Sequence, residues 1–195
     1  RGVGLLRALV LQAATLASPR DLAIVALVPT QTTSSWDWVK WLPHTLPLVA
    51  GVPGARTVAA EPDARTVLGL VDDLITTRRL TAERNPGGSP TGSAVLLVIP
   101  GPIDVPRPAL SRVLADGPGV GVFTLVGAPR AEQLPGECRA IVRAAEDPAA
   151  ASVTLTSTGD AISPLRCDRI GVTRATSAAR ALAPLRDVSA AAATG

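Results

Sequence analysis

The chain has 195 residues, of which 47% are hydrophobic and 18% are charged, so it can fill the core of one globular domain and is not a disordered segment. The formal net charge is only +3 and the arginines are scattered, which argues against a dedicated surface for nucleic acid or anionic membrane. Two isolated cysteines and a single histidine exclude a disulfide framework and metal-ligand spacing, so we predict no metal site.

The first 28 residues predict a helix followed by a buried strand. A helix over residues 3–17 is indicated by apolar residues at helical spacing, namely Leu5, Leu6, Leu9, Val10, Ala13 and Leu16. Residues 22–28 form a continuous apolar run, as in a parallel sheet covered on both faces. Because the chain opens in this helical pattern at Arg1 without a methionine, we interpret it as a piece of a longer protein.

The middle of the chain repeats the alternation of strand and helix. We expect a short strand over residues 56–60 and a helix that Asp63 caps and that runs to about Arg84. Residues 85–92 contain too many glycines and prolines for regular structure and predict a loop. Residues 94–99 form the clearest strand. The apolar runs are far shorter than the roughly 20 residues that a membrane-spanning helix needs.

The last part predicts one more buried strand, two lesser strands and a final helix. We expect a helix over residues 107–115, a strand over 119–126, and strands over 138–144 and 152–158. Thr173 is the expected cap of a helix over residues 174–185, which Pro184 interrupts, and residues 189–195 form a flexible tail. Strands that alternate with helices predict an α/β fold around a mainly parallel sheet.

The most unusual segment holds all three tryptophans and the only histidine, at Trp36, Trp38, Trp41 and His44. We expect Trp38, Trp41 and Leu42 to lie on one side of a short helix and to close one end of the sheet, with Trp36 packed alongside. The alternative is a docking surface for an adjacent domain or subunit, because tryptophan is enriched at interfaces. His44 has no second histidine nearby and is interpreted as a hydrogen-bonded structural residue.

Four segments carry a resemblance to a known family: residues 5–10, 18–22, the run Trp-Asp-Trp-Val-Lys-Trp-Leu-Pro-His at 36–44, and 179–186. They resemble the EccC component of actinobacterial type VII secretion, an ATPase of the FtsK/SpoIIIE type, and within it the first ATPase-like domain. The resemblance implies a RecA-like, three-layer P-loop NTPase fold over residues 1–188. It also implies that the N-terminal strand and most of the phosphate loop precede Arg1.

The same resemblance places degenerate residues at the expected nucleotide site. Gly2 stands where the phosphate-binding lysine belongs, and Val3 and Gly4 stand at the Ser/Thr positions. Pro100 occupies the position of the magnesium-binding acid at the end of the strand over residues 94–99, and Asp104 is the nearest carboxylate. We therefore expect no hydrolysis and no bound cofactor.

The leading hypothesis is a non-hydrolysing, ATPase-like coupling and assembly domain of a membrane-bound secretion motor. The resemblance implies contacts with other domains and subunits, a hexameric parent protein and a place at the cytoplasmic face of the plasma membrane, with membrane contact only through the parent chain. One alternative is a functional ATPase that binds ATP and Mg²⁺, with Arg78 or Arg79 as an arginine finger, although cations at a helix C-terminus also satisfy the dipole. A second is a DNA translocase, although no aromatic residues accompany the arginines, so no specific nucleic acid is expected.

Overall fold

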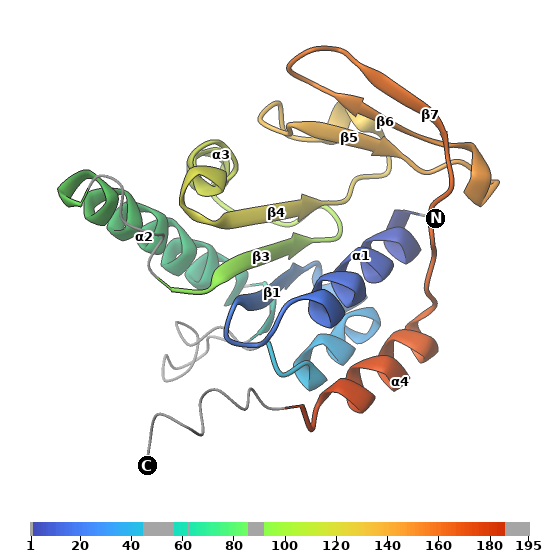
Figure 1. Ribbon diagram of the computed structural model, residues 1–195, viewed down its shortest axis with the longest axis horizontal. Helices are drawn as coiled ribbons and strands as arrows, with labels where there is room; N and C mark the ends of the chain where they lie inside the picture. Colours follow the sequence, from blue (N-terminus) through green and yellow to red (C-terminus); the bar gives the residue numbers. More distant parts are fainter. Residues whose placement is uncertain (1, 45–56, 62, 86–91, 186–195) are drawn as a thin grey trace.

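The computed structural model describes residues 2–44, 57–61, 63–85 and 92–185, which form an α/β fold with a second, smaller sheet (Figure 1). The helices are α1 Gly2–Leu16, α2 Asp63–Arg84, α3 Arg107–Asp116 and α4 Val172–Leu182. The strands are β1 Leu22–Val28, β2 Val58–Ala60, β3 Ala94–Ile99, β4 Val122–Val126, β5 Ala140–Arg143, β6 Ala151–Leu155 and β7 Ala161–Leu165. Short 3₁₀ helices are η1 Thr30–Ser35, η2 Asp37–Trp41, η3 Gly117–Val120, η4 Ala131–Gln133 and η5 Pro148–Ala150.

The main sheet has four strands in the order β2-β1-β3-β4, and every neighbouring pair is parallel. Each of the seven residues of β1 is buried, which a strand in the middle of a sheet covered on both faces requires. The continuous apolar runs of β1 and β3 therefore predicted both the strands and their parallel pairing. This arrangement confirms the expected α/β fold with a parallel sheet.

Helices cover both faces of the main sheet, and the strand residues alternate between two cores. The odd-numbered residues of β1 and β3, such as Val25 and Leu97, pack with the buried sides of α2 and α3. The even-numbered residues, such as Ile24 and Val98, pack with α1, α4 and the tryptophan segment. Figure 1 shows α2 and α3 on one side of the sheet and α1 and α4 on the other, so the domain has three layers.

The second sheet is antiparallel, with the strand order β5-β6-β7. β5 lies within the predicted range 138–144, β6 begins at Ala151 and ends at Leu155 rather than spanning 152–158, and β7 was not predicted. The reason is that β7 contains Pro164 and that four of its five residues are exposed, so it shows no apolar alternation. The lesser strands therefore do not extend the parallel sheet.

Two helices differ from their predicted ends or buried faces. Leu16, the last residue of α1, is 79% exposed and does not belong to the buried side of the helix as predicted. Helix α4 begins at Val172 with Gly171 as its N-cap, so Thr173 is a helical residue and not the predicted cap. The helix ends at Leu182, before Pro184. The predicted tail over residues 189–195 and most of the predicted loop over 85–92 lie outside the described residues.

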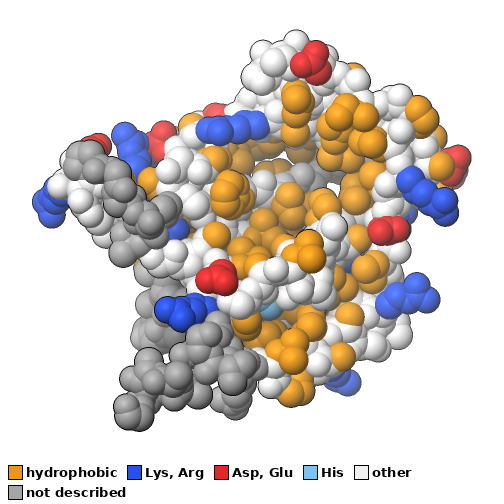
Figure 2. Space-filling model, viewed as in Figure 1, with side chains coloured by type: hydrophobic (Ala, Val, Ile, Leu, Met, Phe, Trp, Pro, Cys, Tyr) orange, Lys and Arg blue, Asp and Glu red, His pale blue; other side chains and the backbone are white. Residues whose placement is uncertain are grey.

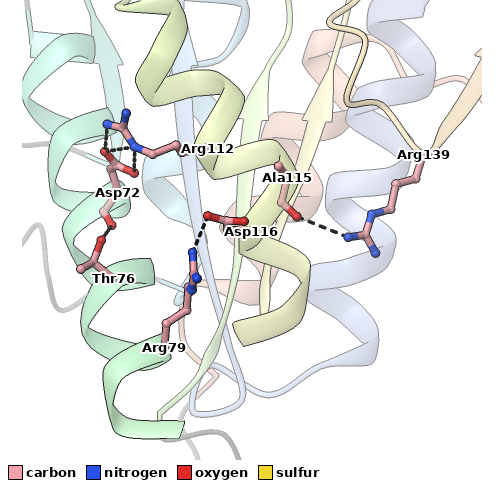
Figure 3. Close-up of polar contacts among 7 residues, drawn as sticks. All are labelled: Asp72, Thr76, Arg79, Arg112, Ala115, Asp116 and Arg139. Atoms are coloured by element: carbon pink, nitrogen blue, oxygen red, sulfur yellow. Dashed lines mark hydrogen bonds and ion pairs between the residues drawn. The ribbon is translucent and has the colours of Figure 1, made fainter. Parts of the chain in front are cut away.

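Side-chain ion pairs join α2 to α3 on the outer surface (Figure 3). The guanidinium of Arg112 donates to both carboxylate oxygens of Asp72, and this hydrogen-bonded charge raises the pKa of Arg112. Arg79 Nη1 lies 2.7 Å from Asp116 Oδ2. Arg139 reaches the end of α3 from the segment before β5 and donates to the Ala115 carbonyl at 3.4 Å. These contacts hold α3 against α2 on one side and against the segment that leads into the second sheet on the other.

Candidate functional site

An open cleft lies between the main sheet and the second sheet and has a volume of about 1640 Å³. Figure 2 shows a hollow at this place, with hydrophobic side chains gathered around it. In open α/β sheets, ligands bind outside the carboxyl ends of the parallel strands, and this cleft includes that edge. Residues from separate parts of the chain line it: the first turns of α1, η1 with Trp36, residues 100–102 after β3, and most residues of 123–144 from β4 to β5.

Proline rings and main-chain atoms make up the floor of the cleft at the strand ends. Pro29 follows β1, Pro100 follows β3 and Gly127 follows β4. A Cβ atom on Gly127 would lie 2.8 Å from both the Pro100 carbonyl oxygen and Leu6 Cδ1, and one on Gly101 would lie 3.3 Å from Pro29 Cγ. The strand ends are therefore in close contact with one another and present apolar rings and carbonyls rather than acids or bases.

The residues proposed for the degenerate nucleotide site come together only in part. Gly2, Val3 and Pro100 all line the cleft, although they lie about a hundred residues apart in the sequence. Gly4 is not among the lining residues, because its carbonyl accepts a 3.0 Å hydrogen bond from the Ile170 amide on the chain entering α4. The structure thus places the beginning of α1 and the end of β3 at one site.

The carboxylate nearest to Pro100 in the sequence points to other partners. Asp104 forms an ion pair with Arg65 of α2, and its amide donates to the carboxylate of Glu61 at 2.6 Å. The carboxylates that do line the cleft are Glu132 and Glu137. Glu137 accepts a hydrogen bond from the Ser111 hydroxyl, which lowers the pKa of this carboxyl. Neither acid follows β3, where a magnesium-binding residue of a P-loop enzyme would stand.

Sequence reasoning did not assign the charged residues between β4 and β5 to the site. Arg130, Arg139 and Arg143, the last residue of β5, line the cleft, whereas the sequence analysis treated the arginines only as scattered along the chain. The available indication was the position of Arg130 in the loop that follows a predicted buried strand, since such loops meet at the carboxyl edge of a sheet. Cys138 also lines the cleft, and its burial raises the pKa of its thiol, so the sulfur is protonated and a poor nucleophile at neutral pH.

The tryptophan segment is largely core, with one exception. Trp36 and Trp38 are 1% and 2% exposed, their ring centroids lie 5.9 Å apart, and Arg7 lies over the Trp36 ring. Trp41 is 39% exposed, so the prediction that it packs into the core is wrong. The η2 helix ends at Trp41, and the chain turns extended at Leu42, whose side chain takes the buried place instead.

The exposed Trp41 ring is flanked by two cations. Lys40 Nζ lies 5.6 Å from its centroid, and the guanidinium carbon of Arg180, on α4, lies 5.0 Å from it. Cations over an indole face are attracted by its quadrupole, so these contacts hold the ring against the end of α4. Trp41 is therefore the tryptophan of the chain whose ring a partner can reach.

His44 is a buried structural residue, as predicted. Its side chain is 2% exposed, and Nε2 lies 2.9 Å from the Ala17 carbonyl oxygen. Because a carbonyl only accepts, Nε2 carries the proton and donates to the end of α1. The His44 carbonyl in turn accepts from the Ile24 amide at 2.8 Å. Within the described ranges, no cluster of three His, Cys, Asp or Glu side chains is arranged to hold a metal.

The two candidate finger arginines are engaged within the chain. Arg78 donates to the Ser93 carbonyl at 2.6 Å and to the Val120 carbonyl at 2.9 Å, just before β3 and β4 begin. Gly92 and Gly121, both with positive φ, leave room for this guanidinium, and partial burial lowers its pKa. Arg79 is held by the ion pair with Asp116 on α3 (Figure 3). Arg78 therefore joins α2 to the edge of the sheet opposite the cleft.

No helix in the described part of the chain is both long and apolar enough to cross a membrane.

Comparison with known proteins finds short but close sequence matches. The chain is 49% identical over 41 residues to the ESX-4 secretion system protein EccC4 of Mycobacterium tuberculosis, a match that covers 21% of this chain and 3% of that protein. It is 42% identical over 43 residues to the ESX secretion system protein EccC of Thermomonospora curvata, covering 22% of this chain and 3% of that protein. The chain thus matches only a small part of the length of these relatives. No family model matches it.

Comparison with solved structures identifies the fold. ATPases 2 and 3 of EssC from Geobacillus thermodenitrificans superpose with a TM-score of 0.62 at 12% identity, over 93% of this chain and 42% of that one. The cytoplasmic domain of the Thermomonospora curvata type VII secretion ATPase EccC gives a TM-score of 0.44 at 18% identity, over 68% of this chain and 17% of that one, which is too low to support a statement about fold. The chain therefore has the α/β fold of the EssC ATPase domains and a segment similar in sequence to EccC proteins.

Proposed function

We propose that this chain is an ATPase-like domain of an EccC-type protein of type VII secretion, and that it couples and assembles parts of the motor without hydrolysing ATP. The sequence matches to EccC4 and EccC support the assignment to this kind of protein, and the superposition on EssC supports the ATPase-like fold. The run from Trp36 to His44, which resembles the first ATPase-like domain, supports that finer placement within the parent protein.

The observation that carries the proposal is the chemistry of the cleft. Phosphoryl transfer needs a lysine on the phosphates, a hydroxyl on the magnesium ion, and an acid that binds the metal or orders the attacking water. The cleft presents Gly2 and Val3 at the start of α1 and Pro100 at the end of β3. Glycine and proline carry no charge and valine carries no oxygen, so these positions give triphosphate and metal no side-chain ligands.

A coupling role also needs a surface that other domains can contact. Trp36 and Trp38 are buried and therefore stabilise the domain itself. Trp41, with Arg180 on α4 beside it, is the candidate contact for a neighbouring domain or subunit, because tryptophan and arginine concentrate binding energy at interfaces. In the parent protein we expect this domain at the cytoplasmic face of the plasma membrane, within a homo-oligomeric and by resemblance hexameric assembly.

Titration calorimetry with ATP and Mg²⁺, together with a phosphate-release assay, tests the proposal. We expect no binding at micromolar ATP and no phosphate release above a protein-free control. An Arg130→Ala variant separates cleft binding from binding elsewhere, because Arg130 lines the cleft and its side chain has no hydrogen bond or ion pair to a described residue. Micromolar binding with turnover, lost in Arg130→Ala, would refute the proposal and establish the alternative of a functional ATPase.

A further inference from the structure

Trp41 is exposed where two elements of one layer meet. Its ring is 39% exposed at the end of η2, and the Arg180 guanidinium of α4 lies over it, 5.0 Å from the centroid. Trp38 of η2 and Ala179 of α4 belong to the core on this face of the main sheet. Figure 1 shows α4 at the periphery of the domain, beside α1. Both elements are therefore anchored in the core, while the ring between them is open to solvent.

The two cations beside Trp41 differ in what they bind. Lys40 forms an ion pair with Asp37, three residues earlier, so its charge is balanced locally. The Arg180 side chain contacts the Trp41 ring and forms no hydrogen bond or ion pair with the described part of the chain. A guanidinium carries five N–H donors, and the contact with the ring does not satisfy them. These donors remain available to an acceptor from another molecule.

The exposed side of α4 extends this positive surface. None of the eleven residues of α4 is acidic, and Arg174 is its second arginine. Arg174 and Arg180 are both exposed and lie six positions apart, which is about 9 Å along the helix axis. The exposed residues between them on the helix surface are small, namely Thr173, Ser177 and Ala181. A segment of another molecule can therefore approach α4 closely and reach both guanidinium groups.

The opposite face of the main sheet is different in charge. Three arginines of α2 and α3 are each paired with a carboxylate, namely Arg65, Arg79 and Arg112. The α2 and α3 surface therefore carries charges of both signs that balance one another. The α4 surface carries two arginines without such partners among the described residues, so its complement is a negatively charged molecule.

The number of charges favours a protein segment over a membrane as this molecule. Segments that bind anionic lipid carry clusters of about four to eight cations. The cations of η2 and α4 are Lys40, Arg174 and Arg180, and the first of them is already paired. Arginine binds a carboxylate through two parallel hydrogen bonds, and tryptophan and arginine concentrate binding energy at protein interfaces. Two arginines beside an indole therefore fit carboxylates that accompany an apolar side chain.

We propose that Trp41, Arg174 and Arg180 form a docking surface for an acidic segment of a partner protein. The segment places carboxylates on the two guanidinium groups and an apolar side chain against the indole ring. This inference deepens the coupling role proposed above, on which it rests, by naming the chemistry of the contact.

NMR titration with a synthetic peptide tests the proposal. The probe is a short peptide of glutamates interrupted by leucines, and its matched control has glutamine in place of every glutamate. Vesicles of phosphatidylserine and phosphatidylcholine form a third arm, which tests a membrane as the alternative. The readout is the indole N–H signal of each tryptophan. Trp36 and Trp38 are the internal references, because both rings are buried.

We expect the acidic peptide to shift the Trp41 signal in a saturable way and to leave the two reference signals in place. Arg180→Gln should weaken the affinity at least about fivefold, and Arg174→Gln at least about twofold. Arg107→Gln is the matched control, because it removes an exposed arginine from α3 on the opposite face of the sheet. It should change the affinity by less than about twofold.

The proposal would be overturned by an unmoved Trp41 signal, by equal binding of the acidic and glutamine peptides, or by equal losses in Arg180→Gln and Arg107→Gln. A shift caused by the vesicles and not by the acidic peptide would also overturn it, because the surface would then bind a membrane. The test is separate from that of the proposed function. ATP turnover is read as phosphate release, whereas docking is read at the Trp41 signal, so each can fail while the other holds.

Discussion

Replacing Arg78 with alanine tests whether this residue stabilises the domain or reserves its charge for a neighbouring subunit. Its guanidinium donates to the carbonyls of Ser93 and Val120, at 2.6 and 2.9 Å. A hydrogen bond to a charged group contributes about 1.5–3 kcal/mol. The side chain is only partly buried, so water replaces some of what is lost. We therefore expect Arg78→Ala to lower the free energy of unfolding by about 2–3 kcal/mol.

Arg79→Ala is the matched control, since it is the next residue on the same helix. The side chains of Arg79 and Asp116 are 52% and 38% exposed, and exposed ion pairs contribute less than about 1 kcal/mol. Arg78→Lys retains the charge, but its single ammonium replaces a fork that reaches two carbonyls, so an intermediate loss is expected. Urea unfolding followed by circular dichroism measures all three variants. A loss below about 0.5 kcal/mol for Arg78→Ala, or equal losses for the two alanine variants, would contradict the reasoning.

Four further substitutions test two tryptophans, the crowded strand ends beside the cleft, and the hydrogen bond to Glu137. Trp36→Ala should lower the free energy of unfolding by about 3–5 kcal/mol in urea titrations, whereas Trp41→Ala should lower it by less than about 1 kcal/mol. Gly127→Ala places a methyl group against the crowded strand ends and should destabilise the domain by about 1–3 kcal/mol, measured by thermal unfolding. Ser111→Ala removes the hydrogen bond that lowers the pKa of Glu137, so the urea midpoint should fall at neutral pH, and its difference from the wild type should shrink as the pH falls below the ordinary pKa of a glutamate.

The sign of the pH effect follows from the direction of the pKa shift. A carboxyl whose pKa is lowered in the folded state stabilises that state above its ordinary pKa, and this contribution disappears as the pH falls through the lowered value. A difference between Ser111→Ala and wild type that grows in acid would show that the hydroxyl does not act through Glu137.

Gly136→Ala is the control for Gly127→Ala at the crowded strand ends, because a Cβ on Gly136 meets no atom within 4 Å.

The central strands were predictable because their patterns admit one structural solution. A seven-residue apolar run such as β1 is stable only inside a covered sheet, and the same holds for β3. The second sheet was less predictable because Val142, Leu155 and Ile162 are at least 40% exposed, so no core-facing alternation separates its strands from loops. The sequence pattern therefore predicts strands that are buried in the core and misses strands whose side chains are largely exposed.

The candidate site was predictable only where a family pattern fixed positions. Gly2, Val3 and Pro100, which the resemblance assigned to the nucleotide site, all line the cleft, and their role there stays a prediction. Arg130 and Arg143, which line the cleft after β4, were not assigned to the site. Between two sheets the sequence shows no local pattern that predicts the direction in which the chain runs. Trp41 was misplaced for a related reason, since helical spacing does not show where a short helix ends.

Because Trp41 is exposed and the other two tryptophans are buried, the intrinsic tryptophan fluorescence of the domain can report on the surroundings of Trp41. An anionic quencher such as iodide is drawn to the cations beside Trp41, while Trp36 and Trp38 are shielded from solvent. The fraction of emission that iodide removes therefore comes mainly from one ring at the end of α4. Any protein that covers this ring restores the lost fluorescence, so association at that surface can be followed without a label.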